Sequence, residues 1–288
     1  QTEFPKPKLE AGGEAFLEIT GAAMTAEVYV NGKKLCRHEG GYSAFRVNVT
    51  EALQDENVLA VSVDNSANTR VYPQQADFTF YGGLYRGVNL ITVPAAHFAL
   101  EYCGTPGIRV TPKLSENLKA AEVELTAWAE CAEGKKVVFS IEGAGEAEGL
   151  VSGGSVSVCI PIEQVRLWDG IADPYLYTAT AVLEGDADQV STRFGCRRFE
   201  MDAEKGFLLN GREYPLRGVS RHQDRKGAGN ALTPEMHRED LAIIREMGAN
   251  TIRLAHYQHA QEFYDLCDEQ GMIVWAEIPY ITQHMPEA

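Results

Sequence analysis

The sequence predicts a multidomain protein in which two β-sandwiches precede the beginning of a parallel α/β domain. Short strand patterns with period two fill the first part of the chain, and a change in their spacing divides them into two groups. A strand–helix–strand–helix–strand series follows Met201, which is typical of a parallel sheet. A chain of 288 residues suits two or three domains. We therefore expect domains over residues 1–96, 97–200 and 201–288.

The first of these regions is typical of a β-sandwich. Asn31-Gly32 lies between β-rich flanks in AEVYVNGKKL, and this dipeptide is the strongest short-range signal for a hairpin. Leu59, Val61 and Val63 alternate with other residues, so they share one face of a later strand.

The second region predicts an immunoglobulin-like sandwich. At least five short strand patterns fall within about 100 residues, which is the usual density of that fold. Val137, Phe139 and Ile141 alternate with polar or small neighbours and are expected to face the core. Trp168 is also expected in the core, because tryptophan is mostly buried.

The third region opens with a second Asn-Gly hairpin at Asn210-Gly211 and continues with two helices between short apolar strands. Thr233 and Pro234 mark a helix start, since threonine caps the helix N-terminus and proline suits its first position. The apolar residues predicted to face inward are Leu241, Ile243, Ile244 and Met247 in the first helix and Phe263, Leu266 and Cys267 in the second. The three strands are predicted in LRGVS, TIRLAH and MIVWAEI.

Three parallel strands cannot close an eight-stranded α/β barrel, which needs about 250 residues. We therefore expect the chain to be a piece of a longer polypeptide, truncated at both ends. We also expect one apolar face of the three strands to lack a partner within the chain.

Composition excludes several classes of protein. Lysine and arginine count 26 against 41 acidic residues, so the net charge of −15 argues against nucleic-acid binding. No run of 18 apolar residues predicts a membrane helix. Six scattered cysteines without a CxxC pair are typical of buried, reduced thiols in a cytoplasmic protein.

Polar side chains follow each predicted strand of the third region. His222 follows the first strand, Arg253 and His256 belong to the end of the second, and Glu277 follows the third. Functional groups of parallel α/β domains gather at these carboxyl ends. One interpretation is a zinc site that uses His222, His256 and His259, although His256 and His259 straddle a strand end and need not converge. The other is a sugar site, in which such groups bind hydroxyls and a carboxylate pair performs acid–base chemistry.

Several long motifs resemble glycoside hydrolase family 2, in the variant closest to bacterial β-galactosidases. RGVSRHQD, TIRLAHYQH and IVWAEIP resemble the opening of the catalytic barrel of that family. YVNGKKLCRHEGGYSAFRVNVTEAL and DFTFYGGLYRGVNL are similar to its sugar-binding jelly roll, and RLWDGIADPYLYTATAVL with TRFGCRRFE to the end of its immunoglobulin-like domain. The resemblance implies a jelly-roll β-sandwich, an immunoglobulin-like β-sandwich and the first three strands of a truncated (β/α)8 TIM barrel.

The resemblance also implies roles for five residues. Asp77 matches an aspartate that reaches from the sandwich into the active site, binds sugar hydroxyls and can ligate sodium. His222 and His256 match histidines that contact the substrate and stabilise the transition state. Arg253 matches an arginine that shapes the pocket floor, and Glu277 matches an acidic position at a strand end.

Two departures from the family pattern affect the chemistry. Ile281 and Gln283 stand where long β-galactosidases carry a Glu-x-His pair of magnesium ligands, so we expect no magnesium site of that kind. Family members retain configuration by using two glutamates, and we expect both beyond Ala288, since the chain contains no Asn-Glu pair. We predict that this chain alone is inactive and requires no cofactor.

The function that the resemblance implies is retaining hydrolysis of terminal β-D-galactosides. The alternatives are a β-glucuronidase or β-mannosidase of the same family, or a non-catalytic carbohydrate-binding β-sandwich protein. The expected partner is a β-galactoside, with no nucleic acid and no membrane, and a homo-oligomer is compatible with the sequence. The expected location is the cytoplasm.

Overall fold

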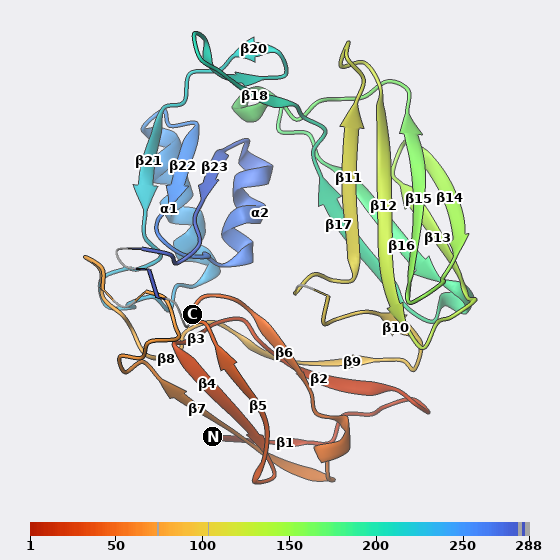
Figure 1. Ribbon diagram of the computed structural model, residues 1–288, viewed down its shortest axis with the longest axis vertical. Coiled ribbons are helices and arrows are strands. Elements are labelled where there is room, and N and C mark those ends of the chain that lie inside the picture. Colours follow the sequence, from red (N-terminus) through yellow and green to blue (C-terminus); the bar gives the residue numbers. More distant parts are fainter. Residues whose placement is uncertain (74, 103, 282–283, 286–288) are drawn as a thin grey trace.

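The structure is a computed structural model, and it describes residues 1–73, 75–102, 104–281 and 284–285. Three domains follow one another along the chain, and the third packs beside both of the others (Figure 1). Both sandwiches and the opening of the α/β domain are present, so the predicted fold class is confirmed.

The N-terminal domain is a sandwich of antiparallel sheets in the orders β1-β7-β4-β5 and β6-β2-β9, with a small β3-β8 pair. Its elements are β1 (Thr2–Pro5), β2 (Glu14–Ile19), β3 (Ala22–Ala23), β4 (Thr25–Val30), β5 (Lys33–Glu39), β6 (Phe45–Asn48), η1 (Thr50–Ala52), β7 (Glu56–Asp64), β8 (Gly83–Leu84) and β9 (Val88–Val93). The predicted hairpin joins β4 to β5, and Asn31 and Gly32 adopt φ values of 53° and 78°. Both angles are positive, as a two-residue hairpin of this type requires.

The second domain packs the sheet β10-β12-β11, extended by β15 on β12, against the sheet β14-β13-β16-β17. Its elements are β10 (His97–Phe98), β11 (Ile108–Leu114), β12 (Ala121–Glu130), β13 (Lys136–Ile141), β14 (Gly145–Leu150), β15 (Ser155–Ile162), η2 (Gly170–Ala172), β16 (Tyr177–Leu183), η3 (Glu184–Asp186) and β17 (Gln189–Phe194). Val137, Phe139 and Ile141 are buried in its core, as predicted. Trp168 is buried as predicted, and its Nε1 donates a hydrogen bond to the Asp268 carbonyl of the third domain at 2.8 Å.

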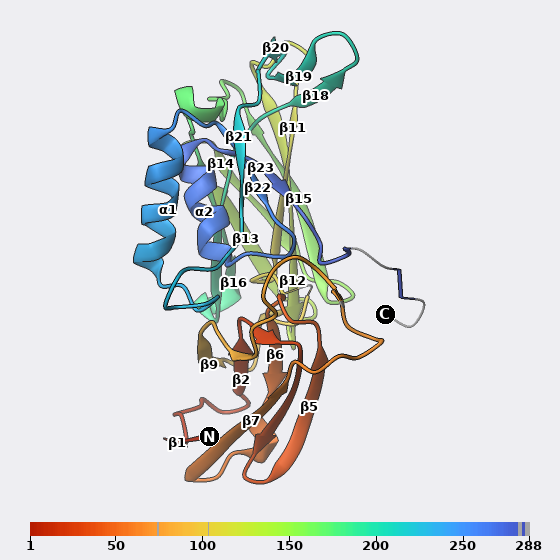
Figure 2. The ribbon, with the colours of Figure 1, turned by 90° about the vertical axis from the view of Figure 1, so that its left-hand side faces the viewer.

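The third domain begins with a hairpin sheet and continues as a parallel sheet in the order β21-β22-β23. Its elements are β18 (Phe199–Asp202), β19 (Gly206–Leu209), β20 (Arg212–Glu213), β21 (Gly218–Arg221), α1 (Pro234–Glu246), β22 (Thr251–Leu254), α2 (Gln261–Gln270) and β23 (Ile273–Ala276). Both helices lie on the same face of the parallel sheet (Figure 2). On β23 and just beyond it, Trp275 is 65% exposed and Ile278 is 68% exposed. These two side chains fit the prediction of an apolar surface without a partner, whereas the outward positions of the neighbouring strand β22 are the polar Thr251 and Arg253.

Helix α1 begins as predicted but buries a different stripe. The Thr233 side chain accepts a hydrogen bond from the Met236 amide, and Leu241 and Ile244 are buried. The prediction that Ile243 and Met247 face inward is wrong, since both are more than half exposed. The buried stripe continues toward the N-terminus through His237, a polar residue, and Met247 lies past the last helical residue.

The expectation of buried thiols is correct for two cysteines and wrong for two others. Cys196 and Cys267 are buried, whereas Cys131 and Cys159 are exposed. Cys131 lies in the turn that follows β12, and Cys159 points outward from β15 because side chains alternate along a strand. Cys103 lies outside the described residues. Neither α-helix in the described part of the chain has the length and apolar character needed to cross a membrane.

A buried arginine joins both helices to the parallel sheet. Arg221, the last residue of β21, pairs with Asp240 of α1 at 2.7 Å. Its guanidinium also donates to His237 Nδ1 and His259 Nδ1, each at 3.0 Å. Burial, reinforced by the charge of Arg221, lowers the pKa of His237 to about 4 and that of His259 to about 3. Both rings are therefore neutral at pH 7, and each accepts a hydrogen bond from Arg221 through Nδ1.

We predict that these two histidines make the fold sensitive to acid. Their folded pKa values lie below the ordinary value of 6.5, so the unfolded chain binds protons first as the pH falls. The stability that the neutral rings contribute is complete above about pH 6.5 and is lost as the pH falls toward 4. Urea titrations at pH 7 and 5 should show a loss of up to about 1.4 kcal/mol per histidine per pH unit.

The H237Q/H259Q double variant should lose less stability over this pH range, because glutamine oxygens can accept from Arg221 but do not titrate. The control is H284Q, which removes an exposed histidine and should leave the pH dependence unchanged. An equal pH dependence in the wild type and the double variant would contradict the assignment.

Candidate functional site

The carboxyl ends of β22 and β23 hold three of the predicted site residues in one hydrogen-bonded unit. Arg253 Nε lies 2.6 Å from Glu277 Oε1, and Arg253 Nη2 lies 3.3 Å from Glu277 Oε2. His256 Nδ1 lies 2.8 Å from Glu277 Oε2 and 3.0 Å from Arg253 Nη2. Because β22 and β23 are parallel neighbours, their ends deliver these groups to the same edge of the sheet.

Glu277 is the charged centre of this unit. Burial acts to raise its pKa, but hydrogen bonds from Arg253 and His256 outweigh burial and hold the pKa below its usual value. Glu277 is therefore ionised at neutral pH and accepts the Nδ1 proton of His256, since a carboxylate is a stronger acceptor than a neutral ring. This hydrogen bond orients the imidazole and leaves Nε2 for another partner.

His222, which follows β21, completes the cluster. Its ring centroid lies 5.2 Å from that of His256, in an edge-to-face arrangement. Burial and the neighbouring His256 lower the pKa of His222, although Asp224 and Asp77 act in the opposite direction. The ring is therefore neutral at pH 7. Its Nδ1 is buried and has no hydrogen-bond partner among the described residues.

A loop of the N-terminal sandwich covers this edge. Phe78 lies between β7 and β8, and its ring centroid is 5.2 Å from His222, 5.9 Å from His256 and 5.3 Å from Tyr257. Asp77 is exposed beside it, close enough for its charge to act on His222. Arg253, Glu277, His256 and His222 therefore lie together, and Asp77 lies exposed at the rim of this cluster.

Arg86, which follows β8, joins the N-terminal sandwich to the third domain. Its guanidinium donates to the carbonyls of Thr20 and Tyr42 within the sandwich, at 3.2 and 2.9 Å. It also donates to the Gln258 carbonyl at 2.7 Å and to Gln223 Oε1 at 3.4 Å in the third domain. The same Gln223 oxygen accepts from the Ala260 amide at 2.7 Å. Arg86 therefore joins two domains through a single planar group.

Sequence reasoning did not identify Phe78, Arg86 or Tyr42 as part of the site, although Tyr257 was noted at the end of the second strand. The rings of Tyr42 and Tyr257 stack across the domain boundary with centroids 4.2 Å apart. Phe78 and Arg86 both lie in the DFTFYGGLYRGVNL motif, so the motif was recognised without the roles of these two residues. The aromatic ring of Phe78 and the charge of Arg86 could have indicated a contact between domains, because such side chains are enriched where protein surfaces pack together.

The structure bears differently on the zinc, sodium and magnesium sites considered from the sequence. A zinc site that includes His259 is wrong, because Nδ1 of His259 accepts from Arg221 and Nε2 lies 3.1 Å from the Ala255 carbonyl. Sodium at Asp77 stays a prediction, and the neighbour identified for this carboxylate is an imidazole, whereas hard cations prefer oxygen ligands. Of the aligned magnesium positions, Ile281 offers no side-chain ligand and Gln283 lies outside the described residues.

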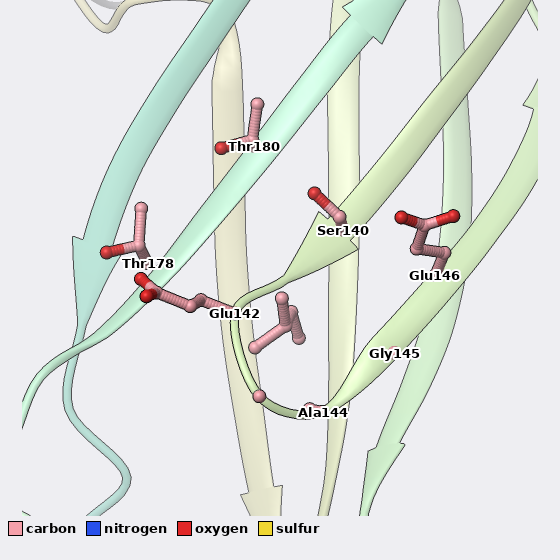
Figure 3. Close-up of a pocket in the computed structure, with 9 residues that line it drawn as sticks. Ser140, Glu142, Ala144, Gly145, Glu146, Thr178 and Thr180 are labelled. Carbon is pink, nitrogen blue, oxygen red and sulfur yellow. The ribbon is translucent and has the colours of Figure 1, made fainter.

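A separate hollow of about 550 Å³ lies on the second domain, at the turn between β13 and β14 (Figure 3). Hydroxyl and carboxylate side chains line it, including Ser140, Glu142, Glu146, Thr178 and Thr180. None of the predicted site residues contributes to it, so we assign the candidate site to the strand ends.

Two sandwiches that lead into an α/β domain with polar strand ends define a class of carbohydrate-active enzymes. Profiles of known families match the chain in three consecutive stretches. They are described as glycosyl hydrolase 2 galactose-binding domain-like over residues 1–92, glycosyl hydrolases family 2 over 106–197, and glycosyl hydrolases family 2, TIM barrel domain, over 200–288. The chain belongs to glycoside hydrolase family 2.

Relatives with two different names match nearly the whole chain. A beta-glucuronidase of Bacteroides fragilis is 36% identical over 94% of this chain and 41% of its own length. Beta-galactosidase BoGH2A of Bacteroides ovatus is 34% identical over 95% of this chain and 33% of its own. The crystal structure of an FMN-binding beta-glucuronidase from Faecalibacterium prausnitzii L2-6 matches with a TM-score of 0.93 and 44% identity, covering 99% of this chain and 45% of that one. The chain thus spans less than half the length of these relatives.

We predict that Arg86→Ala loosens the contact between the first and third domains. The substitution leaves the carbonyls of Tyr42 and Gln258 without their charged donor, which should cost about 3 kcal/mol. Hydrogen exchange should become faster in residues 77–86 and 256–260, with little change in the second domain. The matched control is Arg109→Ala, which removes an exposed arginine on β11. Equal exchange in the two variants would contradict the role of Arg86.

Proposed function

We propose that this chain forms the sugar-binding part of a retaining β-glycoside hydrolase that acts on a terminal β-linked sugar. The observation that carries the proposal is the meeting of the Phe78 loop with His222 and the Arg253–Glu277–His256 unit. Polar groups held in fixed positions beside an aromatic ring suit a sugar, which presents hydroxyls at its edge and C–H groups on its faces.

The proposed division of roles follows from the geometry. Glu277 and Arg253 hold His256 so that Nε2 faces a ligand hydroxyl, and neutral His222 offers a second hydrogen-bonding group. Asp77 accepts hydroxyl protons at the rim, and Phe78 packs against the sugar ring. Retention of configuration requires two further carboxyl groups about 5–5.5 Å apart. We place these in the longer polypeptide, because Glu277 is already committed to Arg253 and His256.

A terminal β-D-glucuronide is the substrate that we propose first. The support is similarity, since relatives named beta-glucuronidase reach 36% identity in sequence and 44% among solved structures. The second candidate is the β-galactoside implied by the sequence motifs. It is favoured by the pairing of Arg253 with Glu277, which leaves this arginine neutralised rather than free to bind a sugar carboxylate.

We predict that residues 1–288 alone hydrolyse neither an aryl β-glucuronide nor an aryl β-galactoside. Loss of both reacting carboxyls removes a catalytic unit whose members act together, so the rate should fall by many orders of magnitude. Release of the aryl alcohol is measured with protein produced in a host strain that lacks its own glycosidases. Turnover above the level of an empty-vector preparation would show that the reacting groups lie within this chain.

In the longer polypeptide, Asp77→Asn and His256→Ala should lower kcat/KM for the preferred glycoside by about 10-fold or more, since each removes a hydrogen-bonding group. Asp55→Asn is the matched control, because it changes an exposed aspartate of the same domain away from the site. The ratio of kcat/KM between glucuronide and galactoside decides the sugar. Unchanged kcat/KM in both site variants would overturn the proposal.

A further inference from the structure

A second group of possible ligands lies at the junction of the two sandwiches, outside the sugar site. Glu14 is the first residue of β2 in the N-terminal domain. His97 of β10 and Glu130 of β12 are opposite each other in the antiparallel register of the second domain. One side-chain ligand atom from each of the three residues lies within 4.8 Å of the other two.

His97 has an unused nitrogen that faces this group. The residue is 1% exposed, and its Nδ1 lies 3.0 Å from the Pro94 carbonyl, where the Nδ1 proton is donated. In this tautomer Nε2 carries no proton and presents its lone pair. It is buried without a hydrogen-bond partner among the described residues. Glu14 Oε2 lies 3.9 Å from Nε2, too far for a hydrogen bond. A buried polar atom without a partner is costly and calls for an explanation, such as an ion.

We propose that Glu14, His97 and Glu130 bind a divalent transition-metal ion of the zinc type. One imidazole nitrogen and two carboxylates match the ligands of Zn²⁺, whereas Mg²⁺ and Ca²⁺ prefer oxygen alone. Zinc binds these atoms at about 2.0–2.2 Å, so an ion between Nε2 and Glu14 Oε2 needs little movement of either. Glu130 is exposed and free to rotate toward the ion, and water can supply a fourth ligand.

The backbone already prepares His97 for this role. Hydrogen bonding of Nδ1 to a carbonyl fixes the tautomer and the ring orientation, which is the usual arrangement for a metal-binding histidine. The ion would connect β2 of one sandwich to β10 and β12 of the other and so stabilise the junction between them. This site does not depend on the proposed glycoside hydrolase function, because it shares no residue with the sugar site.

Calorimetric titration of zinc chloride into chelator-treated chain tests the proposal. We expect one binding event that is weakened at least tenfold in both Glu14→Gln and Glu130→Gln. Glu122→Gln is the matched control, because Glu122 is an exposed glutamate on the same strand β12. Glu130 is exposed, so Glu130→Gln should fold as the wild type does, and His97→Ala serves as a supporting variant. Zinc binding that is equal in all variants, or absent from the wild type, would overturn the proposal.

Thermal unfolding gives a second readout that separates this site from other zinc-binding groups on the surface. Zinc should raise the unfolding temperature of the wild type and of Glu122→Gln, since a ligand that binds only the folded state stabilises it. It should raise that of Glu130→Gln much less. An equal rise in all three proteins would place the ion elsewhere and overturn the assignment.

Discussion

The contact between the first and third domains beside the candidate site is organised by half-buried Arg86, whose guanidinium donates hydrogen bonds to carbonyl oxygens of both domains at once. A lysine could not replace it, because the planar fork presents several donors in fixed directions. Arg86 joins the N-terminal sandwich to the segment that follows β22, and Phe78 of the same sandwich packs on His222 and His256.

Two arginine–carboxylate pairs balance the charge beneath Phe78, one in an inner and one in an outer layer. In the inner layer, Arg221 pairs with Asp240 and is surrounded by two neutral histidines. In the outer layer, Arg253 pairs with Glu277, which also orients His256. Each cation thus has its anion within the protein before any ligand arrives, so little reorganisation is needed on binding.

Local signals in the sequence were sufficient for much of the fold. The Asn31-Gly32 turn, the Thr233 cap and the alternation around Phe139 act over a few residues, and each appears where it was predicted. The polar groups after the three strands could be proposed as a site because parallel strands bring their ends together. The partners of Arg86 and the stacking of Tyr42 on Tyr257 could not be foreseen, since they join residues far apart in sequence. The inward face of α1 was misjudged because His237, a polar residue, occupies the buried stripe.

The Arg86–Gln258 hydrogen bond spans 172 positions of the chain. During synthesis from the N-terminus, Arg86 leaves the ribosome roughly 10–30 s before its partner, at the usual rates of elongation. Until then, Arg86 lacks its hydrogen-bond acceptors in the third domain and is hydrated instead. The second domain, which lies between them in sequence, is completed in the interval. The site consequently cannot assemble before the second strand of the third domain and the segment after it have been synthesised.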